Sequence, residues 1–109
     1  MHGTSTPDND LSESEGVRRV FGDAAPPVSS TKGVTGHLLG AAGAIEAAFS
    51  VMAIRTDTLP PTANLKEVDP RCKLGDYIRG SARHVPCSGV LSNSFGLAGS
   101  NASVFLRQL

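Results

Sequence analysis

Three ionisable side chains lie close together in residues 32–47, which read KGVTGHLLGAAGAIEA. Lys32 and His37 stand five residues apart among glycines, and Glu46 follows inside an apolar segment rich in alanine and glycine. A lone charge is costly to bury unless it is paired or hydrogen-bonded. We therefore expect Glu46 to have a cationic or hydrogen-bonding partner inside the fold.

Common catalytic and cofactor motifs are absent from the rest of the sequence. Its cysteines and histidines lack the spacing of a zinc site. The segments GAAG and GLAG are too short for phosphate loops, and no G-x-S-x-G nucleophile elbow is present. We read His84 as structural or exposed. The polar groups that remain around the apolar segment are His2 with Thr4 and Thr6, Lys32, His37, Glu46 and the turn from Asn93 to Asn101.

Length, charge and cysteine content limit the kinds of protein that this sequence can be. The 109 residues suffice for one small domain, and ten acidic and ten basic residues give a formal charge of zero. That balance removes the electrostatic argument for a nucleic acid or anionic membrane partner. Two cysteines favour a reducing compartment. The segment 38–54 is short beside the roughly 20 strongly apolar residues of a bilayer span, so a buried core helix is expected.

Two helices are expected to position these groups. Asp10 as N-cap with Glu13 three residues later forms a capping-box pattern, and Gly22 would end that helix. A second, longer helix is expected over residues 38–55, apolar nearly all round. Small residues recur along one face of this segment, at Gly36, Gly40, Gly43 and Ala47. This face predicts close packing against another helix or a strand.

The extended segments are short. We expect an extended piece at residues 28–31, an irregular connector over 56–76 and a short strand near 77–79. Strands at 90–94 and 102–106 are joined by the glycine-rich turn 96–99. A fully buried helix needs layers on both sides, and these elements are too few to supply them. The sequence is therefore expected to be part of a larger fold.

Three segments carry a family resemblance: HGTSTPDND at 2–10, SSTKGVTGHLLGAAGAIEA at 29–47 and NSFGLAGSNAS at 93–103. In this order they resemble signatures of the β-ketoacyl-acyl carrier protein synthases, the decarboxylating condensing enzymes of fatty acid and polyketide synthesis. The resemblance makes residues 1–109 the C-terminal portion of such an enzyme. It implies an α/β, thiolase-like layered αβαβα fold, incomplete on its own, with the chain starting in mid-fold at Met1.

The resemblance implies roles for the polar groups. His2 and His37 would hydrogen-bond the malonyl thioester carbonyl and stabilise the enolate left by carbon dioxide, as donors in an oxyanion site do. Each imidazole then needs a partner that fixes its tautomer. Lys32 would be the active-site lysine, paired with acids in a network that includes Glu13 and Glu46.

Further roles concern substrate binding. Thr4 and Thr6 would hydrogen-bond the phosphopantetheine arm of the carrier protein. The turn with Phe95 and Leu97 would lie beside the nucleophile, and one of its backbone N–H groups would help hold the acyl carbonyl. Asn93 and Asn101 are expected to brace this turn.

The sequence also departs from the family pattern. Leu97 stands where the family has a phenylalanine that gates acyl access, and Ala98 stands where it has glycine, so strain is expected at Ala98. Neither Cys72 nor Cys87 resembles the family's nucleophile elbow. We assign no nucleophile and no metal to this chain.

The parent enzyme implied is a 3-oxoacyl-acyl carrier protein synthase of fatty acid biosynthesis that performs decarboxylative Claisen condensation. Its partners would be acyl carrier protein and acyl and malonyl thioesters, in a homodimer without a tightly bound cofactor. This chain alone would be inactive. The alternative is a non-catalytic partner subunit of the same fold, for chain-length control or carrier docking. The cytoplasm is the expected compartment, with the mitochondrial matrix or plastid as the alternative.

Overall fold

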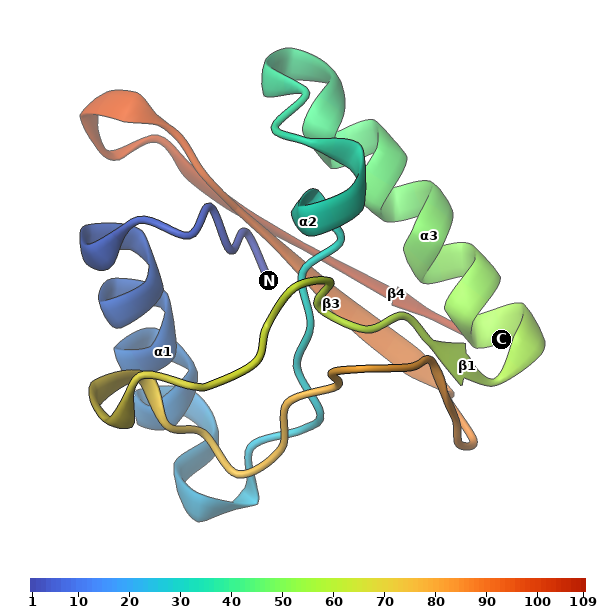
Figure 1. Ribbon diagram of the computed structural model, residues 1–109. Coiled ribbons are helices and arrows are strands. Elements are labelled where there is room, and N and C mark those ends of the chain that lie inside the picture. Colours follow the sequence, from blue (N-terminus) through green and yellow to red (C-terminus); the bar gives the residue numbers. More distant parts are fainter.

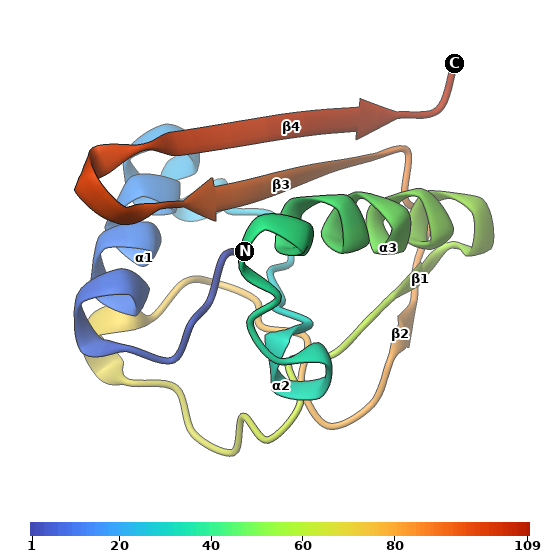
Figure 2. The same ribbon diagram turned by 90° about the horizontal axis from the view of Figure 1, so that it is seen from above.

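A computed structural model describes residues 1–109 (Figure 1). Its elements are helices α1 (Pro7–Phe21), α2 (Lys32–Thr35) and α3 (Ala42–Thr56) and strands β1 (Thr58–Leu59), β2 (Arg83–His84), β3 (Gly89–Phe95) and β4 (Asn101–Arg107). Four 3-10 turns cover Gly22–Ala24, Leu39–Ala41, Pro70–Cys72 and Leu97–Gly99. Helix α3 packs along the β3–β4 hairpin, while α1 contacts the Pro70–Cys72 turn (Figure 2).

The β3–β4 hairpin confirms the two predicted strands, each one residue longer at both ends. The strands are antiparallel, with Val90 opposite Leu106 and Asn93 opposite Ser103. The turn between them places Ala98 in the left-handed region at φ 58° and ψ 28°. Alanine adopts this conformation at a cost that glycine avoids, so the strain expected at Ala98 is present.

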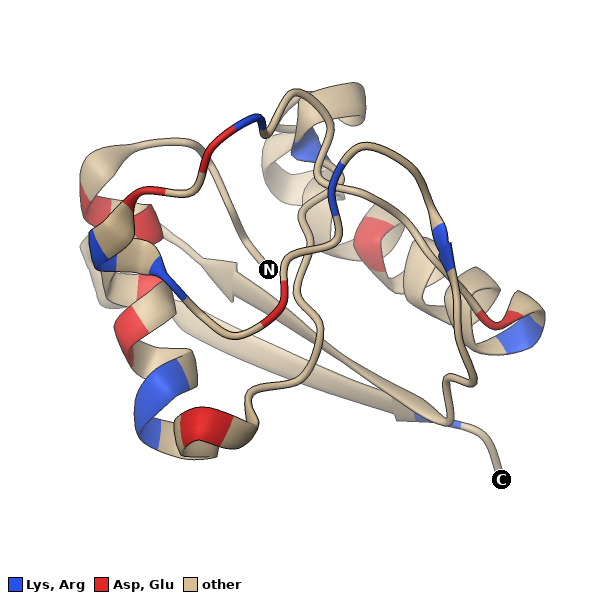
Figure 3. Ribbon diagram, turned by 60° about the horizontal axis from the view of Figure 1, so that its bottom comes forward, with Lys and Arg blue, Asp and Glu red and all other residues tan.

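Helix α1 begins earlier than the capping-box pattern predicts. Thr6 is the N-cap and Pro7 occupies the first helical position, where its fixed φ and missing N–H cost nothing. Asp10 and Glu13 therefore lie inside the helix, and the predicted capping box is wrong. The end at Gly22, with φ 58°, is as predicted. Acidic residues in the first turn and arginines in the last suit the helix dipole (Figure 3).

The apolar segment forms a shorter regular helix than predicted. Leu39, at φ 50°, cannot continue an α-helix, so α3 starts only at Ala42 and runs to Thr56. By length and composition alone, residues 39–56 could cross a membrane, which is weak evidence because core helices of soluble proteins pass the same test. The buried positions of α3 form one narrow stripe, made of Ala42, Glu46, Ser50 and Ala53.

The remaining face of α3 confirms that this chain cannot cover its own helix. Phe49 is 38% exposed and Met52 is 53% exposed. The small-residue face also lacks the expected close partner: a side chain at Gly36 or Gly40 would meet no atom within 4 Å. At Gly43 it would meet only the Ser94 hydroxyl, at 3.9 Å.

Several short elements were not predicted or differ from the prediction. Helix α2 and strands β1 and β2 carry too few residues to leave a periodic pattern. The strand expected at 77–79 exists only as two isolated parallel bridges, from Tyr77 to Val28 and from Arg79 to Thr62. The first of these bridges confirms an extended backbone at Val28.

Two extended segments each have an unpaired edge. Strand β3 pairs only with β4, and Val28 pairs on one side with Tyr77. Between β3, α1 and α3 lies a hollow of about 510 Å³ with many apolar residues in its lining. The buried apolar core is correspondingly small and consists of a cluster of Val17, Val28 and Leu74. The sheet is therefore open, as the sequence predicted for part of a larger fold.

The isolated chain is expected to self-associate through its exposed apolar side chains. The substitutions Met52→Lys and Val104→Lys, at residues that are 53% and 51% exposed, should reduce association without loss of helix. The control substitution Ala53→Lys, at a residue that is 5% exposed, should instead unfold the chain because it buries a charge. Sedimentation velocity and far-ultraviolet circular dichroism measure the two effects. An unmodified chain that sediments as a monomer would contradict the expectation.

Candidate functional site

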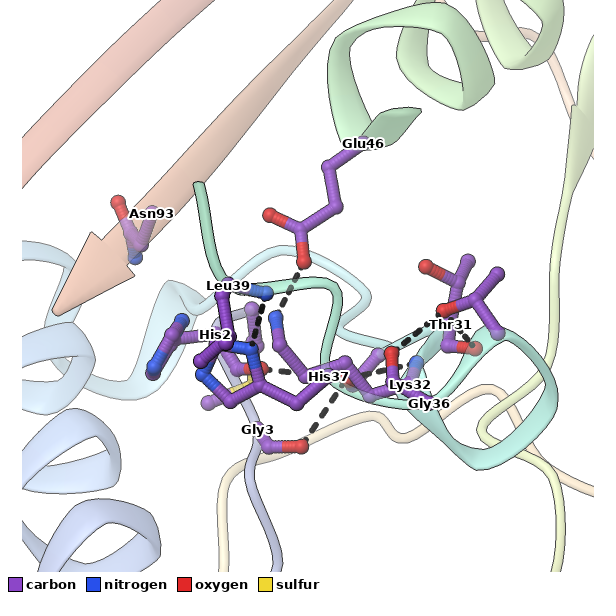
Figure 4. A network of polar contacts seen from close by, with 12 residues as sticks. His2, Gly3, Thr31, Lys32, Gly36, His37, Leu39, Glu46 and Asn93 are labelled. Atoms are coloured by element: carbon purple, nitrogen blue, oxygen red, sulfur yellow. Dashed lines mark hydrogen bonds and ion pairs between the residues drawn. The ribbon is translucent and has the colours of Figure 1, made fainter. Parts of the chain in front are cut away.

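Two histidines from distant parts of the sequence meet at the start of α3 (Figure 4). The rings of His2 and His37 pack edge to face, with centroids 5.2 Å apart and planes at 84°. Phe95, at the end of β3, packs against His2 in the same manner, with centroids 5.9 Å apart. His2 is 6% exposed, whereas His37 faces solvent. The site thus has one buried and one accessible imidazole.

An ion pair lies beside the histidines. Lys32, the first residue of α2, donates to Oε1 of Glu46 on α3, and the two side chains are only 6% and 10% exposed (Figure 4). The cationic partner predicted for Glu46 is confirmed. The other oxygen of Glu46, Oε2, is buried without a hydrogen-bond partner. The pair joins α2 to α3 where the chain would otherwise bury two unpaired charges.

Glu13 holds the backbone next to His2. Its side chain, 2% exposed as a residue, accepts the N–H of His2 at 2.8 Å and the N–H of Gly3 at 2.9 Å. Asn93 donates to the same carboxylate at 3.5 Å and accepts the Ser103 hydroxyl at 2.8 Å. Glu13 makes no hydrogen bond or ion pair with Lys32, so the predicted acid network around Lys32 contains Glu46 alone.

The tautomer of His37 follows from one backbone contact. The N–H of Leu39 donates to Nδ1 of His37 at 3.1 Å (Figure 4). A nitrogen that accepts a hydrogen bond carries no proton, so the neutral ring carries its proton on Nε2. His37 therefore presents an N–H donor on its outer nitrogen.

His2 is held in its neutral form. Burial is the largest cause that lowers the pKa of His2 below its usual 6.5, and the nearby charge of Lys32 lowers it further. Glu13 and Glu46 oppose this shift without reversing it. His2 is thus neutral near pH 7. Its Nδ1 is buried and has no hydrogen-bond partner.

Ser30 was not among the predicted site residues, yet it ties the segments together. Its hydroxyl donates to the carbonyl groups of His2 and Gly3, at 3.4 and 3.2 Å, and accepts the N–H of Lys32 at 3.4 Å. A side chain at Gly3, where φ is 50°, would lie 2.5 Å from the Ser30 Cβ. The only signal for Ser30 in the sequence is its place two residues before Lys32.

The other predicted residues lie at the margin. The hydroxyls of Thr4 and Thr6 contact each other at 3.1 Å on the solvent side. Leu97 is 94% exposed at the tip of the hairpin, so the structure does not bring its side chain to the histidines.

The two cysteines make contacts of their own. The Cys87 N–H donates to Asp57, just past the end of α3 and about 16 Å along the helix axis from Glu46. Cys72 is buried, and its carbonyl accepts the hydroxyl of Tyr77. No hydrogen bond links either cysteine to His2 or His37.

Comparison with known proteins places these features in a family. The model of the β-ketoacyl synthase C-terminal domain matches residues 1–66. The 3-oxoacyl-[acyl-carrier-protein] synthase 2 of Coxiella burnetii is 48% identical over 110 residues, which are 99% of this chain and 26% of that protein. The chain thus spans about a quarter of the length of such relatives.

Solved structures agree with this match. A β-ketoacyl synthase from Burkholderia phymatum matches with a TM-score of 0.94 and 44% identity, over 100% of this chain and 26% of that chain. A chain in the structure of a type II polyketide synthase acyl carrier protein in complex with its ketosynthase matches with a TM-score of 0.93 and 35% identity, over 99% of this chain and 27% of that chain.

The likeness confirms the predicted α/β class, because the matched structures have a thiolase-like fold and this chain overlays their C-terminal part. The family match includes both histidines, the ion pair and Glu13, all within residues 1–66. On these grounds the chain belongs to the β-ketoacyl synthase family, as part of its C-terminal domain.

Proposed function

We propose that this chain supplies the decarboxylation site of a 3-oxoacyl-acyl carrier protein synthase, an acyltransferase of fatty acid biosynthesis. The observation that supports this most directly is the His2–His37 pair, with the proton of His37 on its outer nitrogen. Two imidazoles packed edge to face suit the stabilisation of a negative oxygen, because imidazole N–H groups can donate to it from fixed positions.

The relatives support a substrate carried by an acyl carrier protein. The Coxiella relative is named for the acyl carrier protein, and one matched structure contains a carrier protein bound to its ketosynthase. We infer a malonyl thioester on the phosphopantetheine arm of such a carrier as the substrate. Thr4 and Thr6, whose hydroxyls lie on the solvent side near His2, would bind that arm. The assembled enzyme is proposed to be a homodimer.

The proposed chemistry has two steps. First, the bond between the malonyl carboxylate carbon and C2 breaks, carbon dioxide leaves, and the electron pair forms an enolate with its charge on the thioester oxygen. His2 and His37 would stabilise that oxygen by donating hydrogen bonds. Second, C2 bonds to the carbonyl carbon of an acyl group held on a cysteine, and the cysteine thiolate leaves.

The charged residues would act through the histidines. The Lys32 ammonium helps to keep His2 neutral, because a second positive charge nearby is unfavourable. Glu46 balances Lys32 and prevents an unpaired buried charge. The nucleophilic cysteine would come from polypeptide outside this chain, since neither Cys72 nor Cys87 resembles the nucleophile elbow of the family.

A chimera tests the proposed function. In it, residues 1–109 replace the matching region of the Coxiella enzyme, and the rest of that enzyme supplies the nucleophile. We expect the chimera to release carbon dioxide from malonyl-acyl carrier protein and to form the 3-oxoacyl product. His37→Ala should lower kcat by about 10²- to 10³-fold, the loss typical of one oxyanion donor.

His84 provides the matched control, because it is an exposed histidine whose contact is with Thr58 at 3.4 Å. His84→Ala should leave kcat unchanged. A folded, acylated chimera that releases no carbon dioxide would refute the catalytic proposal and would favour a non-catalytic partner subunit.

The buried ion pair generates a second expectation for the chimera. Glu46→Ala should lower the free energy of unfolding by about 3–5 kcal/mol, because it leaves Lys32 charged and unpaired. The double change Lys32→Met with Glu46→Leu should recover most of this stability, yet not the condensation rate. Urea denaturation and product formation measure the two effects. A loss of only about 1 kcal/mol from Glu46→Ala would show that the pair behaves as an exposed one.

The lowered pKa of His2 predicts a pH dependence of stability. Below pH 6.5 the unfolded chain binds a proton at His2 before the folded chain does. The free energy of unfolding should therefore fall as the pH drops from 6.5 toward the lower pKa of the folded state. Urea denaturation on either side of pH 6.5 measures this slope. His2→Gln should flatten it and His84→Gln should not; equal slopes in all three proteins would contradict the assignment.

A further inference from the structure

We propose that Thr62 is a positioning residue that holds the segment with Ser30 and Lys32 in place beside the histidines. Its hydroxyl accepts the N–H of Ser30 at 3.0 Å, from a part of the chain 32 residues away. Thr62 makes no hydrogen bond to either histidine, so it would act through Ser30 on the backbone of His2 and Lys32. The proposal rests on the function given above, because it concerns how the decarboxylation site is held.

Thr62 takes the place of a backbone hydrogen bond between two extended segments. The N–H of Val28 donates to the Asp76 carbonyl at 2.9 Å, and the N–H of Ile78 donates to the Val28 carbonyl at 3.0 Å. A regular parallel ladder would continue with the Ser30 N–H donating to the Ile78 carbonyl. Instead, the Thr62 N–H donates to that carbonyl at 2.8 Å, and the Thr62 hydroxyl accepts the Ser30 N–H. Thr62 therefore stands between Ile78 and Ser30 at the point where the ladder ends.

The hydroxyl of Thr62 satisfies a buried donor. Ser30 is 7% exposed, and its N–H makes no other hydrogen bond. Buried backbone N–H groups are rarely left without a partner in folded proteins. A side chain with the shape of threonine and no oxygen would leave this N–H unpaired, so the chain at Ser30 would have to move to find water.

The backbone on both sides of Thr62 is restrained. Pro60 and Pro61, the two residues before it, have φ angles that are fixed by their rings. The residue after it, Ala63, lies so close to α2 that a side chain at Gly33 would stand 2.7 Å from the Ala63 carbonyl oxygen. The Thr62 hydroxyl thus offers Ser30 an acceptor at a defined position.

Ser30 connects this position to the site. Its hydroxyl donates to the carbonyl groups of His2 and Gly3 and accepts the Lys32 N–H. A shift of the Ser30 backbone would move this hydroxyl with it, and the three contacts would lengthen together. His2 and Lys32 would then lose a shared anchor. Thr62 therefore affects the reacting groups without touching the substrate.

Amide hydrogen exchange in the ¹⁵N-labelled full chain tests the contact and its transmission. Thr62→Val removes the acceptor and keeps the β-branched shape, so the Ser30 N–H should exchange about tenfold faster, as expected for loss of one hydrogen bond. The Lys32 N–H makes no hydrogen bond with Thr62, yet it should also exchange faster, because its acceptor is the Ser30 hydroxyl. Thr62→Ser keeps the hydroxyl and should preserve slow exchange at both amides.

Thr56→Val is the matched control. The Thr56 hydroxyl is exposed and donates to the Met52 carbonyl at 2.9 Å, at the end of α3. The same change of side chain there should alter neither amide.

The reaction of the chimera gives a second readout. Thr62→Val should lower kcat per acylated enzyme about tenfold and change the KM for malonyl-acyl carrier protein less than about twofold, because it displaces groups that act after binding. Simple loss of stability would instead lower the acylated fraction. Thr62→Ser should recover most of kcat, and Thr56→Val should leave it unchanged.

The two readouts separate the outcomes. Unchanged exchange at Ser30 in Thr62→Val, or faster exchange confined to Ser30, would overturn the proposal. So would an unchanged kcat, or a Thr62→Ser variant that behaves as Thr62→Val does and so assigns the effect to packing of the methyl group. If the chimera with Thr62 intact releases no carbon dioxide, the proposed function fails; faster exchange at both Ser30 and Lys32 would still support the positioning role of Thr62.

Discussion

The ion pair between Lys32 and Glu46 is the interaction on which the site depends. Both side chains are nearly buried, so neither charge is tolerable without the other. Their contact fixes α2 against α3, and His37 lies in the short link between those helices. By joining the two helices, the pair restrains the glycine-rich segment between them and so helps to fix the position of His37.

The rest of the site is held through backbone groups. Glu13 accepts hydrogen bonds from the N–H groups of His2 and Gly3, and the Ser30 hydroxyl donates to their carbonyl groups. The Leu39 N–H donates to the ring of His37. The contacts of Glu13 and Ser30 restrain the backbone at His2 and leave its imidazole free, whereas the Leu39 N–H occupies Nδ1 of His37 and leaves Nε2 free. A site built this way tolerates changes at exposed side chains more readily than changes at the few buried polar ones.

The sequence predicted what depends on composition and strong local patterns. The β3–β4 hairpin, the partner of Glu46 and the uncovered face of α3 follow from alternation, burial cost and a count of elements. The predicted start of α1 at Asp10 was wrong, because Pro7 is suited to the first helical position and the helix begins there. The contacts of Ser30 with the carbonyl groups of His2 and Gly3 could not be predicted from the sequence, because they arise only once distant segments meet.

The unpaired edge of β3 also shapes how the chain can exist in a cell. No charged residue interrupts residues 89–95, and β4 has only Arg107 (Figure 3). Edges without charges, prolines or bulges are templates for strand addition by other chains. Whatever polypeptide occupies that edge protects the chain from aggregation as well as completing its sheet.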